Sequence, residues 1–273
     1  MKFVITALQL LLPLIYLGAG AVYLRYYVTR ARPLRRLCRL ALLTTLGTHF
    51  VFLLAQGAAH GWIPLISPGH AMSMTAAAIL GVYLVIEWRS NNRVMGVFLI
   101  APALLFQVLS TFLTGELTEV PKILLSVRLP IHALPAVLGY AGLAIGAVFS
   151  MLMLVLRRQI KRRRIGRIYR RLPSLRVLDT MSFHATLAGF ALLSLSVVTG
   201  SMWAAHEWNT LLPADPKLMG ILVVWAMYAI GVTMRWLPGV SRRTRTLWLL
   251  VCFGALTFTF SLLDLIVESR HSW

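Results

Sequence analysis

Acidic residues and charged residues in general are scarce in this sequence. Only 8 of its 273 residues are Asp or Glu, against 27 Lys and Arg, and charged residues make up 13% of the chain. Because a soluble globular domain carries about a quarter charged residues, the composition excludes an ordinary soluble enzyme or binding domain. A hydrophobic fraction of 59% and a mean hydropathy of +0.78 indicate an integral membrane protein instead.

Cysteine is also rare, which removes two classes of redox protein. The 2 cysteines, Cys38 and Cys252, form neither a CxxC nor a CxxCH motif. The chain is therefore neither a thiol redox enzyme of the usual type nor itself a c-type cytochrome. We expect both cysteines to be small buried packing residues. HExxH and HxxxH motifs are absent as well, so nothing indicates a zinc site.

Apolar runs of about twenty residues recur along the whole chain. Each is long enough to cross a hydrocarbon core of about 30 Å, and in lipid the backbone must form its hydrogen bonds within the segment, as a helix does. The first run resembles a signal peptide, but it continues into an arginine cluster, which favours an uncleaved span. The sequence predicts an all-α fold, a polytopic membrane helix bundle of about eight transmembrane helices that forms a single transmembrane domain over 1–273. The predicted spans are 3–24, 40–59, 70–88, 94–114, 129–156, 181–204, 217–237 and 246–266.

The basic residues are distributed unequally between the two sides of this bundle. The first, third, fifth and seventh connections hold 22 of the 27 Lys and Arg residues, and the other side holds 5. Basic connections face the cytoplasm, so both termini are predicted to lie outside, and 157–180 is a basic cytoplasmic loop. The net charge of +19 then reflects orientation and attraction to membrane lipid, and no nucleic-acid partner is expected.

Small residues at helical spacing mark one close contact between helices. Gly142, Gly146 and Ser150 stand four residues apart in the predicted fifth span. This spacing places them on one face, where a neighbouring helix can approach closely.

Histidines inside or beside the spans are the residues best suited to bind a cofactor. His49 lies within the second span, where an ionisable residue is costly and commonly functional. It is either a neutral imidazole that forms hydrogen bonds between helices or an axial ligand to heme. Heme needs one or two histidines and an apolar slot, so b-type heme is the cofactor that fits best.

Two further histidines are candidates at the ends of spans. His132 opens the fifth span near the outer surface, and Arg128 lies one turn earlier on the same helix face. A histidine on iron with a guanidinium near a heme propionate is chemically reasonable, although the pair could equally anchor a helix end. His184 begins the sixth span at the inner face, where an interfacial role is the alternative to iron ligation.

The outer loop after the sixth span has a distinctive pattern. It reads Gly200-Ser201-Met202-Trp203-Ala204-Ala205-His206-Glu207-Trp208, followed by Asp215-Pro216-Lys217. Taken singly, its parts have structural explanations. Tryptophans populate the membrane interface, and Asp215 before Pro216 is a typical start of a helix.

Together, these residues resemble the tryptophan-rich loop of the cytochrome c assembly family (the CcsA/CcmC-like proteins). The similarity covers roughly 125–265. It implies that Trp203, Trp208 and Asp215 belong to a heme platform and that His132 is an outer heme ligand. Residues 209–214 lack the further tryptophans of full members, Leu218 replaces an acidic residue, and 218–237 contains no histidine. The chain is thus most similar to the motif-poor HemX/YpjD-like branch.

The resemblance implies a membrane-embedded, heme-handling accessory protein in cytochrome c assembly or heme biogenesis. Its expected location is the bacterial inner membrane, with heme and other cytochrome c assembly proteins as partners. Binding or delivery of heme is expected rather than catalysis, and no catalytic residue is assigned. Two alternatives remain open: a cofactor-free scaffold that contacts a cytoplasmic enzyme through its basic loop, and a small-molecule transporter.

Overall fold

The computed structural model describes residues 2–60, 67–90, 93–114, 128–163, 166, 170–210 and 215–261. Over these residues the regular structure is entirely helical, as the sequence predicts. The chain forms two compact units, residues 1–130 and 131–273.

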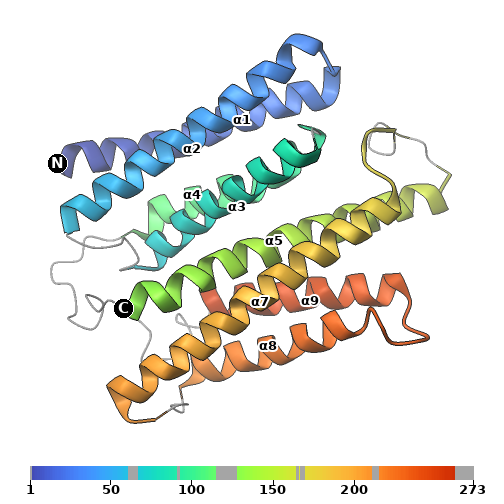
Figure 1. The fold of residues 1–273 in the computed structure, drawn as a ribbon. Coiled ribbons are helices and arrows are strands. Elements are labelled where there is room, and N and C mark those ends of the chain that lie inside the picture. The colour runs from blue at the N-terminus through green and yellow to red at the C-terminus, as the bar shows by residue number, and fades with distance from the viewer. Residues whose placement is uncertain are drawn as a thin grey trace. The chain divides into compact units, whose positions relative to one another are not determined.

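The first unit packs four long helices, α1 (Lys2–Thr29), α2 (Arg32–His60), α3 (Pro68–Ser90) and α4 (Gly96–Leu113), with a short 3-10 helix, η1 (Arg93–Met95). Figure 1 shows α1 beside α2, and α3 beside α4. Large side chains fill the core: Tyr16, Tyr23 and Tyr83 are completely buried. The ring of Tyr23 and the hydroxyl of Tyr83 occupy the space where a Cβ at Gly96 would stand.

The second unit is built from α5 (Arg128–Lys161), α7 (Leu175–Trp208), α8 (Pro216–Thr233) and α9 (Arg242–Ser261). The predicted small-residue face of α5 is confirmed, and it packs against α7. A Cβ at Gly142 would lie 2.9 Å from the Cα of Gly189. About two turns further along α5 and two turns back along α7, the hydroxyls of Ser150 and Ser182 are 2.7 Å apart.

Seven helices in the described part of the chain are long and apolar enough to cross a membrane: α1, α2, α3, η1 continuing into α4, α5, α7 and α8. The protein is therefore a multi-pass helical membrane protein. The eighth predicted span corresponds to α9, whose first turn is charged and whose described part ends at Ser261. Both cysteines are free and buried, which confirms that prediction.

The helices extend beyond the predicted spans at their arginine-rich ends. Only Arg30 and Ala31 separate α1 from α2, where the predicted spans leave residues 25–39 between them. Helices α5 and α7 have 34 residues each, which makes each about 51 Å long. The physical reason is that arginine is a good helix former, so a helix does not end where its apolar run ends.

Candidate functional site

Within the described residues, the ring of His132 on α5 forms hydrogen bonds through Nδ1 only. Its Nδ1 lies 2.9 Å from the backbone oxygen of Ser196 on α7. Because a carbonyl oxygen can only accept, Nδ1 carries the proton and donates it. The Ser196 hydroxyl donates to the backbone oxygen of His132 at 3.1 Å, so the bonding between the two residues is reciprocal. Among the described residues, none forms a hydrogen bond with Nε2, which in the neutral ring bears a lone pair.

Two residues one and two turns along α7 from Ser196 complete the surroundings of this ring. A Cβ at Gly200 would lie 2.7 Å from both Cε1 and Nδ1 of His132. The imidazole therefore occupies the space that a side chain at residue 200 would need. The indole of Trp203 lies 6.2 Å from the imidazole, centroid to centroid. Trp203 is buried, and its Nε1 has no hydrogen-bond partner in the described part of the structure.

His49 on α2 has the opposite arrangement, because both ring nitrogens are engaged. The Tyr16 hydroxyl lies 2.7 Å from Nδ1, and Nε2 lies 3.0 Å from the Ser73 hydroxyl. Ser73 in turn donates to Oε1 of Gln107 at 3.0 Å. The Ser73 hydroxyl must therefore accept from Nε2, and Nδ1 must accept from Tyr16. The result is a continuous, completely buried chain of hydrogen bonds that joins α1, α2, α3 and α4.

Of the remaining predicted site residues, only His184 and Asp215 have described side chains, and His184 lies away from His132. His184 is exposed on α7, twelve residues and therefore about 18 Å of helix from Ser196. Arg128 is the first residue of α5 and Trp208 the last of α7, but the placement of both side chains lies outside the described residues. Within that description, no cluster of three or more His, Cys, Asp or Glu residues could hold a metal ion.

Asp215 has a structural role that the sequence predicted. Its Oδ1 accepts hydrogen bonds from the backbone nitrogens of Lys217 and Leu218, at 3.0 and 3.2 Å. With Pro216 in the first helical position, Asp215 caps the start of α8, because the first backbone N–H groups of a helix lack partners inside it. Asn209, in the left-handed conformation at φ 54°, ends α7 on the other side of this loop.

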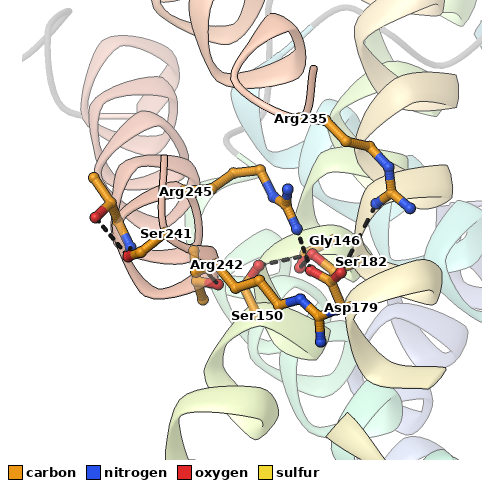
Figure 2. A network of polar contacts seen from close by, with 10 residues as sticks. Gly146, Ser150, Asp179, Ser182, Arg235, Ser241, Arg242 and Arg245 are labelled. Atoms are coloured by element: carbon orange, nitrogen blue, oxygen red, sulfur yellow. Dashed lines mark hydrogen bonds and ion pairs between the residues drawn. The ribbon is translucent and has the colours of Figure 1, made fainter. Parts of the chain in front are cut away.

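Sequence reasoning did not identify a buried carboxylate in the second unit. Asp179 on α7 accepts a hydrogen bond from Arg245 of α9 at 2.5 Å and pairs with Arg235 at 3.9 Å. Figure 2 shows both guanidinium groups directed at this carboxylate, with the Ser150–Ser182 contact beside it. Arg235 also lies over the ring of Phe183, 4.2 Å from its centroid. These contacts hold α9 and the connection before it against α7.

The first unit also contains a buried carboxylate, Glu87 of α3. The hydroxyls of Tyr23 and Tyr83 donate to its Oε2 at 2.5 and 2.9 Å. Its Oε1 lies 3.2 Å from Nε of Arg93 and 3.8 Å from Nε of Arg39. Glu87 is one of few carboxylates in the predicted spans, and its position among inner-side arginines was the available sequence signal.

Comparison with known proteins supports the resemblance carried by the outer loop. A family model described as Cytochrome C assembly protein matches residues 34–271. Protein HemX from Brevibacillus brevis is 24% identical over 95% of this chain and 96% of its own length. Protein HemX from Bacillus subtilis is 30% identical over 55% of this chain and 54% of its own. The cytochrome c biogenesis protein CcsA of Chlamydomonas reinhardtii is 28% identical over 64% of this chain.

The extent of these alignments differs between relatives. The Brevibacillus alignment runs nearly end to end, whereas the other two span about half the length of the curated proteins they match. The family model and the CcsA relative support a role in cytochrome c biogenesis.

Proposed function

The chain belongs to the cytochrome c assembly protein family, and we propose that it binds and passes on heme, with His132 as the iron ligand. The observation that carries this proposal is the hydrogen bonding of His132. Nδ1 donates to the Ser196 backbone oxygen at 2.9 Å, which leaves the lone pair of Nε2 for a ligand. Metal-binding histidines almost always donate their other N–H to a backbone carbonyl or a carboxylate, which fixes the ring and raises its basicity.

The surroundings of His132 fit a bound porphyrin in two further respects. Gly200 holds the ring against α7 without a side chain in the way. Trp203 provides an indole N–H with no protein partner in the described part of the chain, which is a donor for a polar edge of a ligand. Arg128, four residues before His132 on α5, is the proposed partner of a propionate, because guanidinium binds carboxylate bidentately.

In this proposal His49 is not a ligand. Both of its nitrogens are already used, by Tyr16 and Ser73, so iron could be bound only after a buried hydrogen bond is broken. The protein's own part is to hold the His132 ring, keep its protonated nitrogen on Ser196 and present Nε2. The heme would be b-type and non-covalently held, and the protein would lie in a bacterial inner membrane with the site facing outward.

The test is the absorption spectrum of the detergent-purified protein titrated with hemin. We expect a Soret band shifted from that of free hemin, and we expect His132→Gly to abolish the shift. Added imidazole should restore it in that variant, because it replaces the missing ring. His184→Gly is the matched control, since it removes an exposed histidine of the same unit.

Two results would overturn the assignment. The first is a spectrum that matches free hemin in the unmodified protein, which would favour the cofactor-free scaffold or the transporter. The second is an unchanged shift in His132→Gly. If the His184 control also loses the shift, the loss reflects general damage to the protein. Imidazole then separates damage from loss of the ligand, because it restores the shift only where a missing His132 ring is the cause.

A further inference from the structure

Two serine hydroxyls of α7 bind the backbone of α5 at separate points of the same interface. Ser182 donates a hydrogen bond to the backbone oxygen of Gly146 at 3.0 Å. Ser196 donates one to the backbone oxygen of His132 at 3.1 Å. Both serines are 3% exposed. On each helix the two contacts are fourteen residues apart, 132 to 146 on α5 and 182 to 196 on α7, which is about 21 Å of helix.

The two serines differ in the second contact that each hydroxyl makes. Ser182 Oγ lies 2.7 Å from the hydroxyl of Ser150, whereas Ser196 Oγ lies 3.2 Å from Nδ1 of His132. Because the Ser196 hydroxyl gives its one proton to the backbone oxygen of His132, its oxygen can only accept from Nδ1. The carbonyl of Ser196 also accepts from Nδ1, at 2.9 Å. One residue therefore offers two acceptors to the same ring N–H.

A proline weakens the turn of α5 that carries His132. Pro135 lies inside α5, and it has no N–H to donate to the backbone oxygen of Ile131, which its ring also crowds. The helix by itself therefore holds this turn less firmly than its other turns. The Ser196 hydroxyl provides a hydrogen bond from the neighbouring helix at this turn.

We propose that Ser196 is a positioning residue for the iron ligand and acts through His132. Its hydroxyl holds the α5 backbone at residue 132 against α7, and its two oxygens keep the ring protonated at Nδ1, so that the lone pair is on Nε2. A hydrogen bond at one ring nitrogen raises the basicity of the other, so Ser196 also sets how strongly the imidazole donates to iron. The effect on iron rests on the proposed function, and the effect on the ring does not.

The first measurement uses the full chain in detergent without heme. Nitrogen NMR of isotope-labelled histidine rings distinguishes the two neutral tautomers, and the His132 signals are the ones missing in His132→Gly. We expect only the tautomer protonated at Nδ1 in the unmodified protein. Ser196→Ala removes the hydroxyl but keeps the carbonyl, and it should give a mixture of both tautomers because the ring is no longer held against that carbonyl. A ring that stays protonated at Nδ1 alone in this variant would overturn the proposal.

The second measurement is the affinity for hemin and the reduction potential of the bound heme. Loss of a group that orients a metal-binding histidine typically lowers metal affinity 10–100-fold. Since the Ser196 carbonyl remains, we expect Ser196→Ala to bind hemin about tenfold more weakly, at the lower end of that range. Its reduction potential should be higher, because a less basic imidazole stabilises ferric iron less.

Ser182→Ala is the matched control, since it removes the equivalent hydrogen bond to α5 at the other point of the interface. It should lower the unfolding temperature about as much as Ser196→Ala does, and keep the hemin affinity and reduction potential of the unmodified protein. An equal loss of affinity in both variants would make Ser196 a structural contact only, and unchanged affinity and potential in Ser196→Ala would also overturn the proposal. If the unmodified protein does not bind hemin but the tautomers change as expected, the proposed function fails and the role of Ser196 in holding the ring stands.

Discussion

Each of the two units contains a histidine between its helices, and the two histidines differ in how many ring nitrogens the protein uses. His49 in the first unit has both nitrogens bonded, to Tyr16 and Ser73. His132 in the second unit has Nδ1 on Ser196 and no described partner for Nε2. Depth in the membrane alone therefore does not make a histidine a candidate ligand. In the proposed function, the number of ring nitrogens that remain available is what distinguishes His132 from His49.

The units also share a feature, a buried carboxylate between two arginines, and differ in how completely it is enclosed. Glu87 has two tyrosine hydroxyls in addition to its two arginines. Asp179 has Arg245 at close range, and Arg235 is 31% exposed and further away. Glu87 links α3 to α2 and η1, and Asp179 links α7 to α9 and to the connection before it. In each unit, a buried charge therefore holds separate segments together.

The largest expected effect comes from removing these two carboxylate charges. Breaking a buried ion pair by removing one partner costs about 3–5 kcal/mol, because the other charge remains buried and unpaired. We expect Glu87→Gln to lower the free energy of unfolding by about that amount, since Arg93 is almost completely buried. Asp179→Asn should cost less, because Arg235 can turn to solvent.

Thermal unfolding in detergent, followed by circular dichroism, compares the two variants directly. Arg235→Gln serves as the control and should have a small effect, since its pairing distance is 3.9 Å. An Asp179→Asn variant less stable than Glu87→Gln would contradict the ranking, and with it the conclusion that the first unit has the more enclosed carboxylate.

The next effect concerns the stability contributed by the two histidines. His49→Ala leaves the hydroxyl of Tyr16 without an acceptor and Ser73 without a donor, both of them buried. An unsatisfied buried polar group costs about 1–3 kcal/mol, so we expect a loss of about 3 kcal/mol in total. His132→Ala should cost less, because Ser196 still donates to the backbone oxygen of residue 132.

Chemical unfolding in detergent measures both losses of stability, and hemin titration of the same samples measures the Soret shift. We expect each variant to affect one of these two quantities and not the other. His49→Ala reduces stability and keeps the Soret shift in the folded fraction, whereas His132→Ala loses the shift at little cost in stability. A His49→Ala variant of normal stability that has lost the shift would reverse the two roles.

The sequence predicts the helices of both units well because apolar runs of span length have few alternatives in a membrane. Helix ends are predicted less well, as at Arg30, because arginine tolerates both a loop and a helix. The contact surface at Gly142 and Gly146 is predictable, since helical spacing alone brings the two residues to one face.

The partners of the site residues could not be predicted in the same way. His132 and Ser196 are separated by 64 residues in sequence, and Arg245 and Asp179 by 66. Such pairs depend on which helices are neighbours and on how each is rotated, and a single sequence constrains neither. For His49, the sequence left both the structural and the ligand interpretation open, and the partners of its two ring nitrogens, Tyr16 and Ser73, come from two other helices.

The smallest expected effect tests how the helices of each unit approach one another. In the second unit, a Cβ at Gly142 would stand 2.9 Å from Cα and 3.1 Å from N of Gly189, and these backbone atoms cannot move aside without displacing α7. We expect Gly142→Ala to lower the free energy of unfolding by about 1–3 kcal/mol, the usual cost of overpacking. Thermal unfolding in detergent is the measurement.

Gly81 on α3 of the first unit is the matched control, because a Cβ there would meet no atom within 4 Å. Since alanine is a better helix former than glycine, Gly81→Ala should raise stability by up to about 1 kcal/mol. Opposite signs for the same substitution would mean that glycine is required where α5 meets α7 and is dispensable at this point of α3. If Gly142→Ala is also neutral or stabilising, the α5–α7 interface has room to relax. The contact between His132 and Gly200, which belongs to the same interface, would then no longer fix the orientation of the imidazole.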